Sequence, residues 1–151
     1  MGEPPPVLWS TPAWSIHAAP GWRPEDRGDH VALLSSAPDT QLLITNHGVR
    51  ETGLTARQWV DFAASVHPPK GRPLVEVVCG DFTGYRTEFA ILDSPVPPVG
   101  QDRWLRGWML ERDGVPLDVT YTCPLACAGR DDDAVASMLG TLRLIRETDR
   151  G

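Results

Sequence analysis

Hydrophobic and polar residues alternate along several short stretches of this chain, and such alternation is typical of a β-strand with one buried face. In Trp14–Ala18, the side chains of Trp14, Ile16 and Ala18 share one face, and Pro20-Gly21-Trp22 then ends the pattern. Leu117, Val119, Tyr121 and Cys123 alternate in the same way with polar residues. We expect the remaining strands at residues 30–36, 41–46, 74–79, 85–91 and 103–111.

Turn-forming residues separate these strands at hairpin spacing. Ala37-Pro38-Asp39-Thr40 joins two short apolar runs, so residues 30–46 are predicted to form a hairpin. Asp113-Gly114 predicts a second hairpin, because both central positions of a type I′ turn need a positive φ. Gly80 and Gly84 indicate a bend or bulge within one long strand. Residues 93–102 are rich in proline and are predicted to form a loop.

Two stretches show a helical period instead. Thr55 and Gln58 have the spacing of a capping box, and Pro68-Pro69 forbids continuation, which predicts a helix over residues 56–66. Its apolar stripe consists of Trp59, Phe62, Ala63 and Val66. A second helix is predicted to begin at the acidic residues 131–133, which suit the positive end of a helix. Its stripe consists of Val135, Met138, Leu139 and Leu142, with Arg143 and Arg146 near its end.

Short links between strands require antiparallel pairing, and two amphipathic helices need an apolar sheet face to cover. We therefore predict an α+β fold, an antiparallel sheet packed with two main helices as an α/β sandwich. Residues 1–13 are predicted to be a disordered or extended Pro-rich arm. Residues 14–147 are predicted to form a single domain, a size at which a chain needs no disulfide or metal to fold.

This layout resembles the Mog1/PsbP-like superfamily over about residues 14–145. The resemblance is carried by the opening strand with Pro20-Gly21-Trp22, the helix from Thr55, the stretch 117–124, and the closing Met138-Leu139-Gly140-Thr141-Leu142-Arg143. It implies an α+β sandwich and a binding role, since members of that superfamily are regulators, photosystem subunits, effector chaperones and lipoproteins. It transfers no functional residue to this chain.

The charge and the termini narrow the range of partners. The net charge of −6 weighs against nucleic acid and anionic membrane surfaces. No stretch approaches the roughly 18 apolar residues of a membrane span, and Met1-Gly2-Glu3-Pro4-Pro5-Pro6 does not resemble a signal peptide. We therefore expect a cytoplasmic protein, in which Cys79, Cys123 and Cys127 are free thiols.

Residues with catalytic or metal-binding chemistry do not form a recognisable motif. Cys123 and Cys127 are one residue too far apart for a redox pair, and a zinc site would need about four ligands. The four histidines (His17, His30, His47 and His67) lack metal-ligand spacing, and the serines and glycines form no nucleophile elbow or phosphate loop. The sequence therefore predicts no catalytic residue, metal ligand or cofactor.

The most suggestive candidate site is a partner surface made of Trp104, Arg106 and Trp108. These residues alternate, so they share one face of a strand, and tryptophan and arginine are enriched in binding hot spots. The alternative is that both tryptophans belong to the core and Arg106 extends past them to solvent.

Two functions follow from this reading. The first is a non-enzymatic protein-interaction module, such as an adaptor, an effector chaperone or an immunity-type protein with an unidentified protein partner. The second is a small-ligand carrier or an enzyme that uses a cleft between sheet and helix. Asp81, Arg86, Glu88 and His47 are the polar residues that such a cleft could contain. A deep pocket would favour the second function, and a flat, filled domain would weigh against it.

Overall fold

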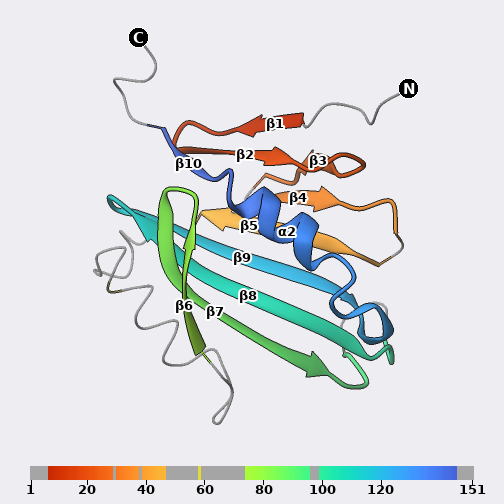
Figure 1. Ribbon diagram of the computed structural model, residues 1–151. Helices are drawn as coiled ribbons and strands as arrows, with labels where there is room; N and C mark the ends of the chain where they lie inside the picture. The colour runs from red at the N-terminus through yellow and green to blue at the C-terminus, as the bar shows by residue number, and fades with distance from the viewer. Residues whose placement is uncertain are drawn as a thin grey trace.

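The computed structural model describes residues 7–28, 30–37, 39–46, 58, 74–95 and 99–145. Within these residues, strands account for 57% and helices for 11%. The strands form two antiparallel sheets, one of three strands and one of seven, which are linked by one α-helix (Figure 1). No helix among these residues is long and apolar enough to cross a membrane.

The seven-stranded sheet is the main layer, with the order β3-β4-β5-β9-β8-β7-β6. Every neighbouring pair is antiparallel. Its strands are β3 (Arg23–Asp26), β4 (His30–Leu34), β5 (Gln41–Asn46), β6 (Leu74–Cys79), β7 (Phe82–Ile91), β8 (Arg103–Arg112) and β9 (Val115–Pro124).

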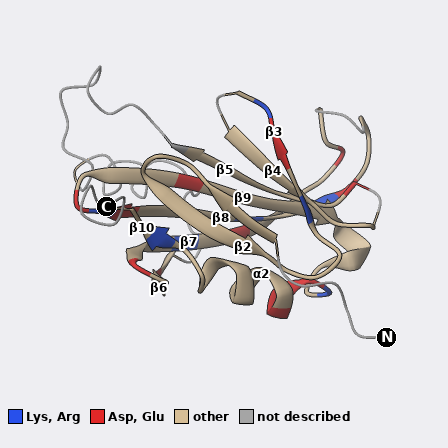
Figure 2. Ribbon diagram, turned by 90° about the horizontal axis from the view of Figure 1, so that it is seen from above, with Lys and Arg blue, Asp and Glu red and all other residues tan. Residues whose placement is uncertain are grey.

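The three-stranded sheet has the order β1-β2-β10, which joins strands from the first and last parts of the described chain. Its strands are β1 (Val7–Ser10), β2 (Trp14–Ala18) and β10 (Arg143–Leu144), and both outer strands run antiparallel to β2. The helix α2 (Asp132–Leu139) lies on one face of the seven-stranded sheet, after a 3₁₀ turn at Leu125–Cys127 (Figure 2).

The core fills the space between β2, α2 and the inner face of the seven-stranded sheet. The alternation predicted for β9 is confirmed, because Leu117, Val119, Tyr121 and Cys123 are fully buried. The predicted hairpins at residues 30–46 and at Asp113-Gly114 are also confirmed. Asp113 and Gly114 both have positive φ angles, of 46° and 86°, as a type I′ turn requires.

The predicted fold class, an α+β sandwich with two main helices, is wrong for the described residues. The second predicted helix has only eight residues, because it ends at Leu139, and Arg143–Leu144 instead pairs with Ser15 and Trp14 of β2. Part of the segment predicted to be helical therefore belongs to a sheet. The helix predicted over 56–66 lies outside the described residues, apart from Gln58.

Strand pairing corrects the expectation for Gly80 and places part of the expected N-terminal arm. Gly80 does not bend a long strand, because Gly80 and Asp81 form the turn of a hairpin between β6 and β7. Gly80 has a φ of 61°, and a Cβ there would collide with the carbonyl group of Leu142. The first strand, β1, lies within the arm predicted over residues 1–13 and is extended, but it pairs with β2.

Candidate functional site

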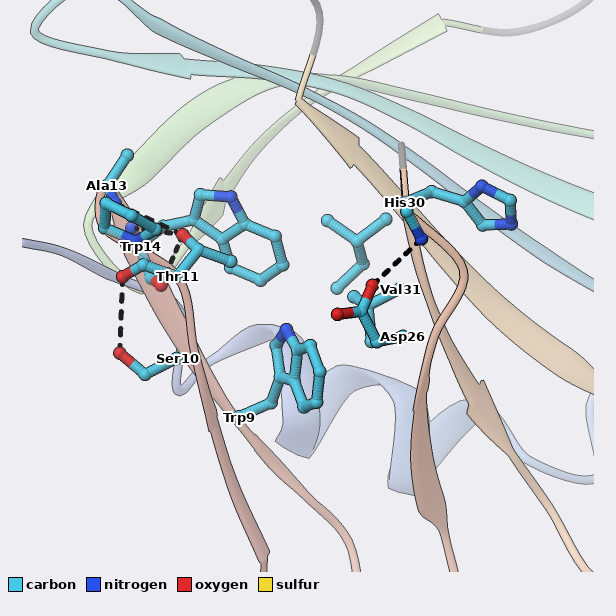
Figure 3. A pocket seen from close by; sticks show the side chains of 11 residues that line it. Trp9, Ser10, Thr11, Ala13, Trp14, Asp26, His30 and Val31 are labelled. Atoms are coloured by element: carbon cyan, nitrogen blue, oxygen red, sulfur yellow. Dashed lines mark hydrogen bonds between the residues drawn. The ribbon is translucent and has the colours of Figure 1, made fainter.

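A pocket with a volume of about 460 Å³ lies between the two sheets. One wall is the β1–β2 hairpin, and the other is the β3–β4 hairpin together with β5. Figure 3 shows Trp9 and Trp14 on the first wall and Asp26 and Val31 on the second. This volume falls within the range of small-ligand sites, which run from about 300 to 1,000 Å³.

Apolar side chains form the inner part of this inter-sheet pocket. Trp14, Val31 and Ile44 are almost completely buried, and all three belong to the hydrophobic core. Val31 and Ile44 are opposite each other in the β4–β5 ladder, and Trp14 begins β2. The base of the pocket is therefore built on rigid strands, which is where a binding site is held most reproducibly.

The turn between β1 and β2 uses its own polar groups. The Thr11 hydroxyl donates to the carbonyl of Trp14 (3.0 Å) and accepts from the N–H groups of Ala13 and Trp14, at 3.2 and 3.0 Å. The Ser10 hydroxyl donates to the carbonyl of Thr11 at 3.3 Å. These hydroxyls stabilise the turn, so they offer little hydrogen-bonding capacity to a ligand.

Trp9 is the exception among the polar groups of the pocket. Its Nε1 atom is buried and donates no hydrogen bond to any described residue. A buried donor without a partner costs about 1–3 kcal/mol relative to one that is paired. Figure 3 shows this nitrogen on the edge of the indole that points toward the side of the pocket holding Asp26 and Val31.

Asp26 supplies the charged side chain at this pocket, from the exposed end of β3. Its Oδ1 atom accepts a hydrogen bond from the Gly28 N–H at 2.9 Å, which orients the carboxylate. Its Oδ2 atom accepts none from the part of the chain that the structure describes. The ring of His30, by contrast, points away from Trp9 and Trp14, as Figure 3 shows.

The predicted partner surface lies at the other end of the core. Trp104, Arg106 and Trp108 do share a face of β8, but this face turns toward α2. Trp108 is 4% exposed and Arg106 is 9% exposed, and Trp104 is partly buried against the core. Little of Trp108 and Arg106 is therefore accessible, and a partner contact at Trp104 stays a prediction.

Arg106 is held there by two carboxylates and an aromatic ring. Its Nη1 atom donates to Asp132 Oδ1 of α2 at 2.9 Å, and the guanidinium lies 5.4 Å from the ring centroid of Trp108. Arg106 Nε is 3.0 Å from Glu88 Oε2, yet the N–H does not point at this oxygen, so we treat the contact as an ion pair only. These interactions attach α2 to the sheet.

A second polar cluster connects the start of α2 to the core. The buried Tyr121 hydroxyl donates to Asp131 Oδ2 at 2.6 Å, and Arg130 donates to the same oxygen at 2.8 Å. Burial and the bond to Asp131 raise the pKa of Tyr121. Burial opposes the charge of Asp131, but the bonds from Arg130 and Tyr121 outweigh it and lower the pKa of Asp131. Asp131 occupies the N-cap position of α2, but its side chain makes no capping hydrogen bond.

The polar residues suggested for a sheet–helix cleft do not converge on one site. Arg86 and Arg106 line a small cavity of about 150 Å³ beneath α2. Asp81 instead accepts a hydrogen bond from the N–H of Leu144 at 2.9 Å, which fixes the β6–β7 turn to β10. Glu88 pairs with Arg106, and His47 lies outside the described residues.

The cysteines are free in this structure, and two of them are buried. Burial raises the pKa of the Cys79 thiol to about 11, although nearby Arg86 lowers it in part. Burial also raises the pKa of Cys123. The described residues contain no group of three or more histidine, cysteine or acidic side chains that could hold a metal ion.

Sequence reasoning missed the inter-sheet pocket because its walls have weak local signals. Trp9 lies in the predicted arm, where the run Val7-Leu8-Trp9 after three prolines was the available clue. Asp26 belongs to the strand Arg-Pro-Glu-Asp, which has no alternating apolar residues. Only the tertiary structure places these residues opposite each other.

Comparison with known proteins finds similar folds and no similar sequence. No family model and no curated protein matches the chain. LpqN of Mycobacterium tuberculosis, described as involved in cell envelope biogenesis, is similar over 94% of this chain and 90% of its own, with a TM-score of 0.60 and 12% identity. A Bacteroides thetaiotaomicron protein has the same TM-score and 14% identity over 89% of this chain.

This chain spans 46% of the length of the Bacteroides protein. At these identities the similarity shows a shared fold and transfers no function. The resemblance to the Mog1/PsbP-like superfamily is not tested by either neighbour and stays a prediction.

Proposed function

We propose that this protein binds a small, mainly apolar ligand in the inter-sheet pocket and acts as a carrier or ligand-dependent binding protein. The observation that carries this proposal is the buried Nε1 of Trp9, which has no partner among the described residues and lies beside a pocket of about 460 Å³. The ligand-carrier alternative raised by the sequence is therefore preferred, although the site lies between the sheets and not between sheet and helix.

The chemistry of the lining supports binding over catalysis. The walls are mostly indole and aliphatic surface, and Thr11 and Ser10 are already engaged within the turn. A general acid or base must reach the reacting group with a partner that orients it, and the His30 ring points elsewhere. Apolar walls with a few fixed polar groups are the usual composition of a ligand site.

A titration with Nile red, a neutral apolar dye, tests this function. The native protein should give saturable fluorescence enhancement with one dye bound per chain. Ala13→Phe places a ring in the pocket and should weaken binding at least about 10-fold, since the dye and the ring compete for the same volume. Circular dichroism and thermal unfolding should confirm that the variant is folded.

Ala126→Phe provides the matched control, because Ala126 is exposed on the 3₁₀ turn and does not line the pocket. This variant should bind Nile red like the native protein. Absence of saturable binding to the native protein, or equal loss in both variants, would contradict the proposed function.

A protein-interaction module, the first function predicted from the sequence, is a second candidate. It is favoured by apolar residues on β6, the last strand of the seven-stranded sheet, where Val78 is 75% exposed and Val75 is 43% exposed. Exposed apolar edge strands are sites for pairing with another chain. A protein that co-purifies with the native chain and is lost on Val78→Lys would support this candidate, and retention would contradict it. The predicted cytoplasmic location is a separate expectation, which cell fractionation tests.

A further inference from the structure

The inter-sheet pocket offers a hydrogen-bond donor and a hydrogen-bond acceptor to whatever occupies it. The donor is Trp9 Nε1, which is buried and without a partner among the described residues. The acceptor is Oδ2 of Asp26, since Oδ1 already accepts the Gly28 N–H. In Figure 3, the nitrogen edge of Trp9 and the carboxylate of Asp26 face the same part of the pocket, next to Val31.

These two groups restrict the charge of the ligand. An anionic head group would satisfy Trp9 but would be repelled by Asp26, the one charged residue whose side chain faces this part of the pocket within the described chain. An ammonium group would suit Asp26 but offers no acceptor to the Trp9 N–H. A hydroxyl group does both, because its oxygen accepts from Trp9 while its hydrogen is donated to Asp26.

The rest of the lining determines the body of the ligand. Trp14, Val31 and Ile44 present buried aromatic and aliphatic surface, and burying apolar area against it contributes about 25 cal/mol per Å². Polar groups on the body of the ligand would lose water there and gain no partner from the engaged hydroxyls of Thr11 and Ser10.

We infer that the ligand of this pocket is a neutral apolar alcohol, whose hydroxyl bridges Trp9 Nε1 and Asp26 while its hydrocarbon part packs against Trp14, Val31 and Ile44. This inference rests on the proposed function, because it specifies the ligand of the same pocket. It adds a head-group chemistry and a charge preference that binding of an apolar dye does not require.

Competition by compounds of equal chain length against bound Nile red tests the head group. We expect 1-decanol to displace the dye most effectively at pH 7.5. Decyl methyl ether, which accepts but cannot donate, should be weaker by about 3- to 10-fold, the usual value of one hydrogen bond. Decanoate should be the weakest competitor, because its carboxylate would lie beside that of Asp26.

Two variants assign the effects to the two residues. Trp9→Phe removes the N–H but keeps an aromatic wall, so it should lower the affinity for 1-decanol about 3- to 10-fold relative to the affinity for Nile red measured on the same variant. Asp26→Asn removes the charge but keeps a carbonyl oxygen, so it should raise the affinity for decanoate relative to the affinity for 1-decanol measured on the same variant. Trp104→Phe is the control, since Trp104 is partly exposed and lies outside the pocket.

The outcomes separate this inference from the proposed function. If Nile red binds but decanoate competes better than 1-decanol, or if Trp9→Phe and Trp104→Phe behave alike toward 1-decanol, the head-group assignment is wrong while the pocket remains a ligand site. If Nile red does not bind at all, the proposed function itself fails.

Discussion

The core has one end beneath α2 and another at the inter-sheet pocket, and the two ends differ in how their polar groups are paired. Beneath α2, most polar groups of the described residues are paired within the chain, as in the bond of Tyr121 to Asp131 and the pairing of Arg106 Nη1 with Asp132, although Arg106 Nε makes no hydrogen bond. Between the two sheets, the buried N–H of Trp9 has no partner within the part of the chain that the structure describes, and it lies beside a pocket of about 460 Å³. The α2 end is therefore built for stability, whereas the pocket end retains a capacity for binding.

Thiol accessibility should show the largest difference, because Cys79 is buried at the α2 end, in the wall of the small cavity beneath the helix. Cys79 is buried and its pKa is about 11, so we expect it to react with a thiol reagent at pH 8 at least about 100-fold more slowly than the partly exposed Cys127. Mass spectrometry after timed labelling measures both rates. A Cys127→Ser variant should lack the fast phase, and a fast phase that persists would contradict the assignment.

The same thiol gives a pH dependence of stability. The pKa of Cys79 is higher in the folded chain than its ordinary value of 9.0, so the unfolded chain ionises first as the pH rises. The un-ionised Cys79 thiol contributes its full stabilisation of the fold below pH 9, and this stabilisation is lost as the pH rises toward about 11. Urea unfolding at pH 8 and pH 10.5 should show lower stability at the higher pH, and Cys79→Ala should reduce this difference.

A pair of identical substitutions compares the packing of the two ends. Val31 and Val119 both neighbour Ile44 in the sheet, on β4 and β9. Val119→Ala opens a cavity in filled core and should cost about 2–3 kcal/mol. Val31→Ala enlarges an existing pocket and should cost about 1 kcal/mol, because this side chain has fewer packing partners to lose. Equal losses in urea denaturation would show that the pocket is packed like the rest of the core.

Removing the Tyr121 hydroxyl tests whether the polar cluster at α2 stabilises the fold. Tyr121→Phe should cost about 1–2 kcal/mol at pH 7, since the hydroxyl bonds to a charged carboxylate. The pKa of Asp131 is lowered in the folded chain, so this contribution is present above its ordinary value of 3.8 and is lost as the pH falls below it. A penalty that does not shrink in acid would contradict the role of Asp131.

The smallest effect on stability is expected at Trp9. Trp9→Phe deletes a buried N–H that has no partner within the described chain, so the loss of packing is offset and stability should change by about 0.5 kcal/mol or less. Trp108→Phe should cost more because Trp108 is 4% exposed and contacts Arg106. Thermal unfolding of both variants measures the difference, and a larger cost at Trp9 would indicate a structural role.

Local patterns were sufficient to predict most of the long strands and two of their turns. In β9, alternation alone predicts which side chains are buried, since the period of a strand does not depend on its partner. The turn at Asp113-Gly114 could be predicted because only a few residues tolerate positive φ at both positions. Alternation predicts that Trp104, Arg106 and Trp108 share one face of β8. It does not predict that α2 covers this face.

The amino-acid sequence by itself determined the strands β2, β4, β5, β8 and β9, because their alternation and turn residues are local properties. Only the tertiary structure decided the three-stranded sheet, the short length of α2 and the inter-sheet pocket. β1, β3 and β10 are short and partly polar, so they become strands through hydrogen bonds to distant neighbours such as Trp14 and Leu34. The pocket depends on these pairings, since Trp9 and Val31 lie on different sheets and no local pattern brings them together.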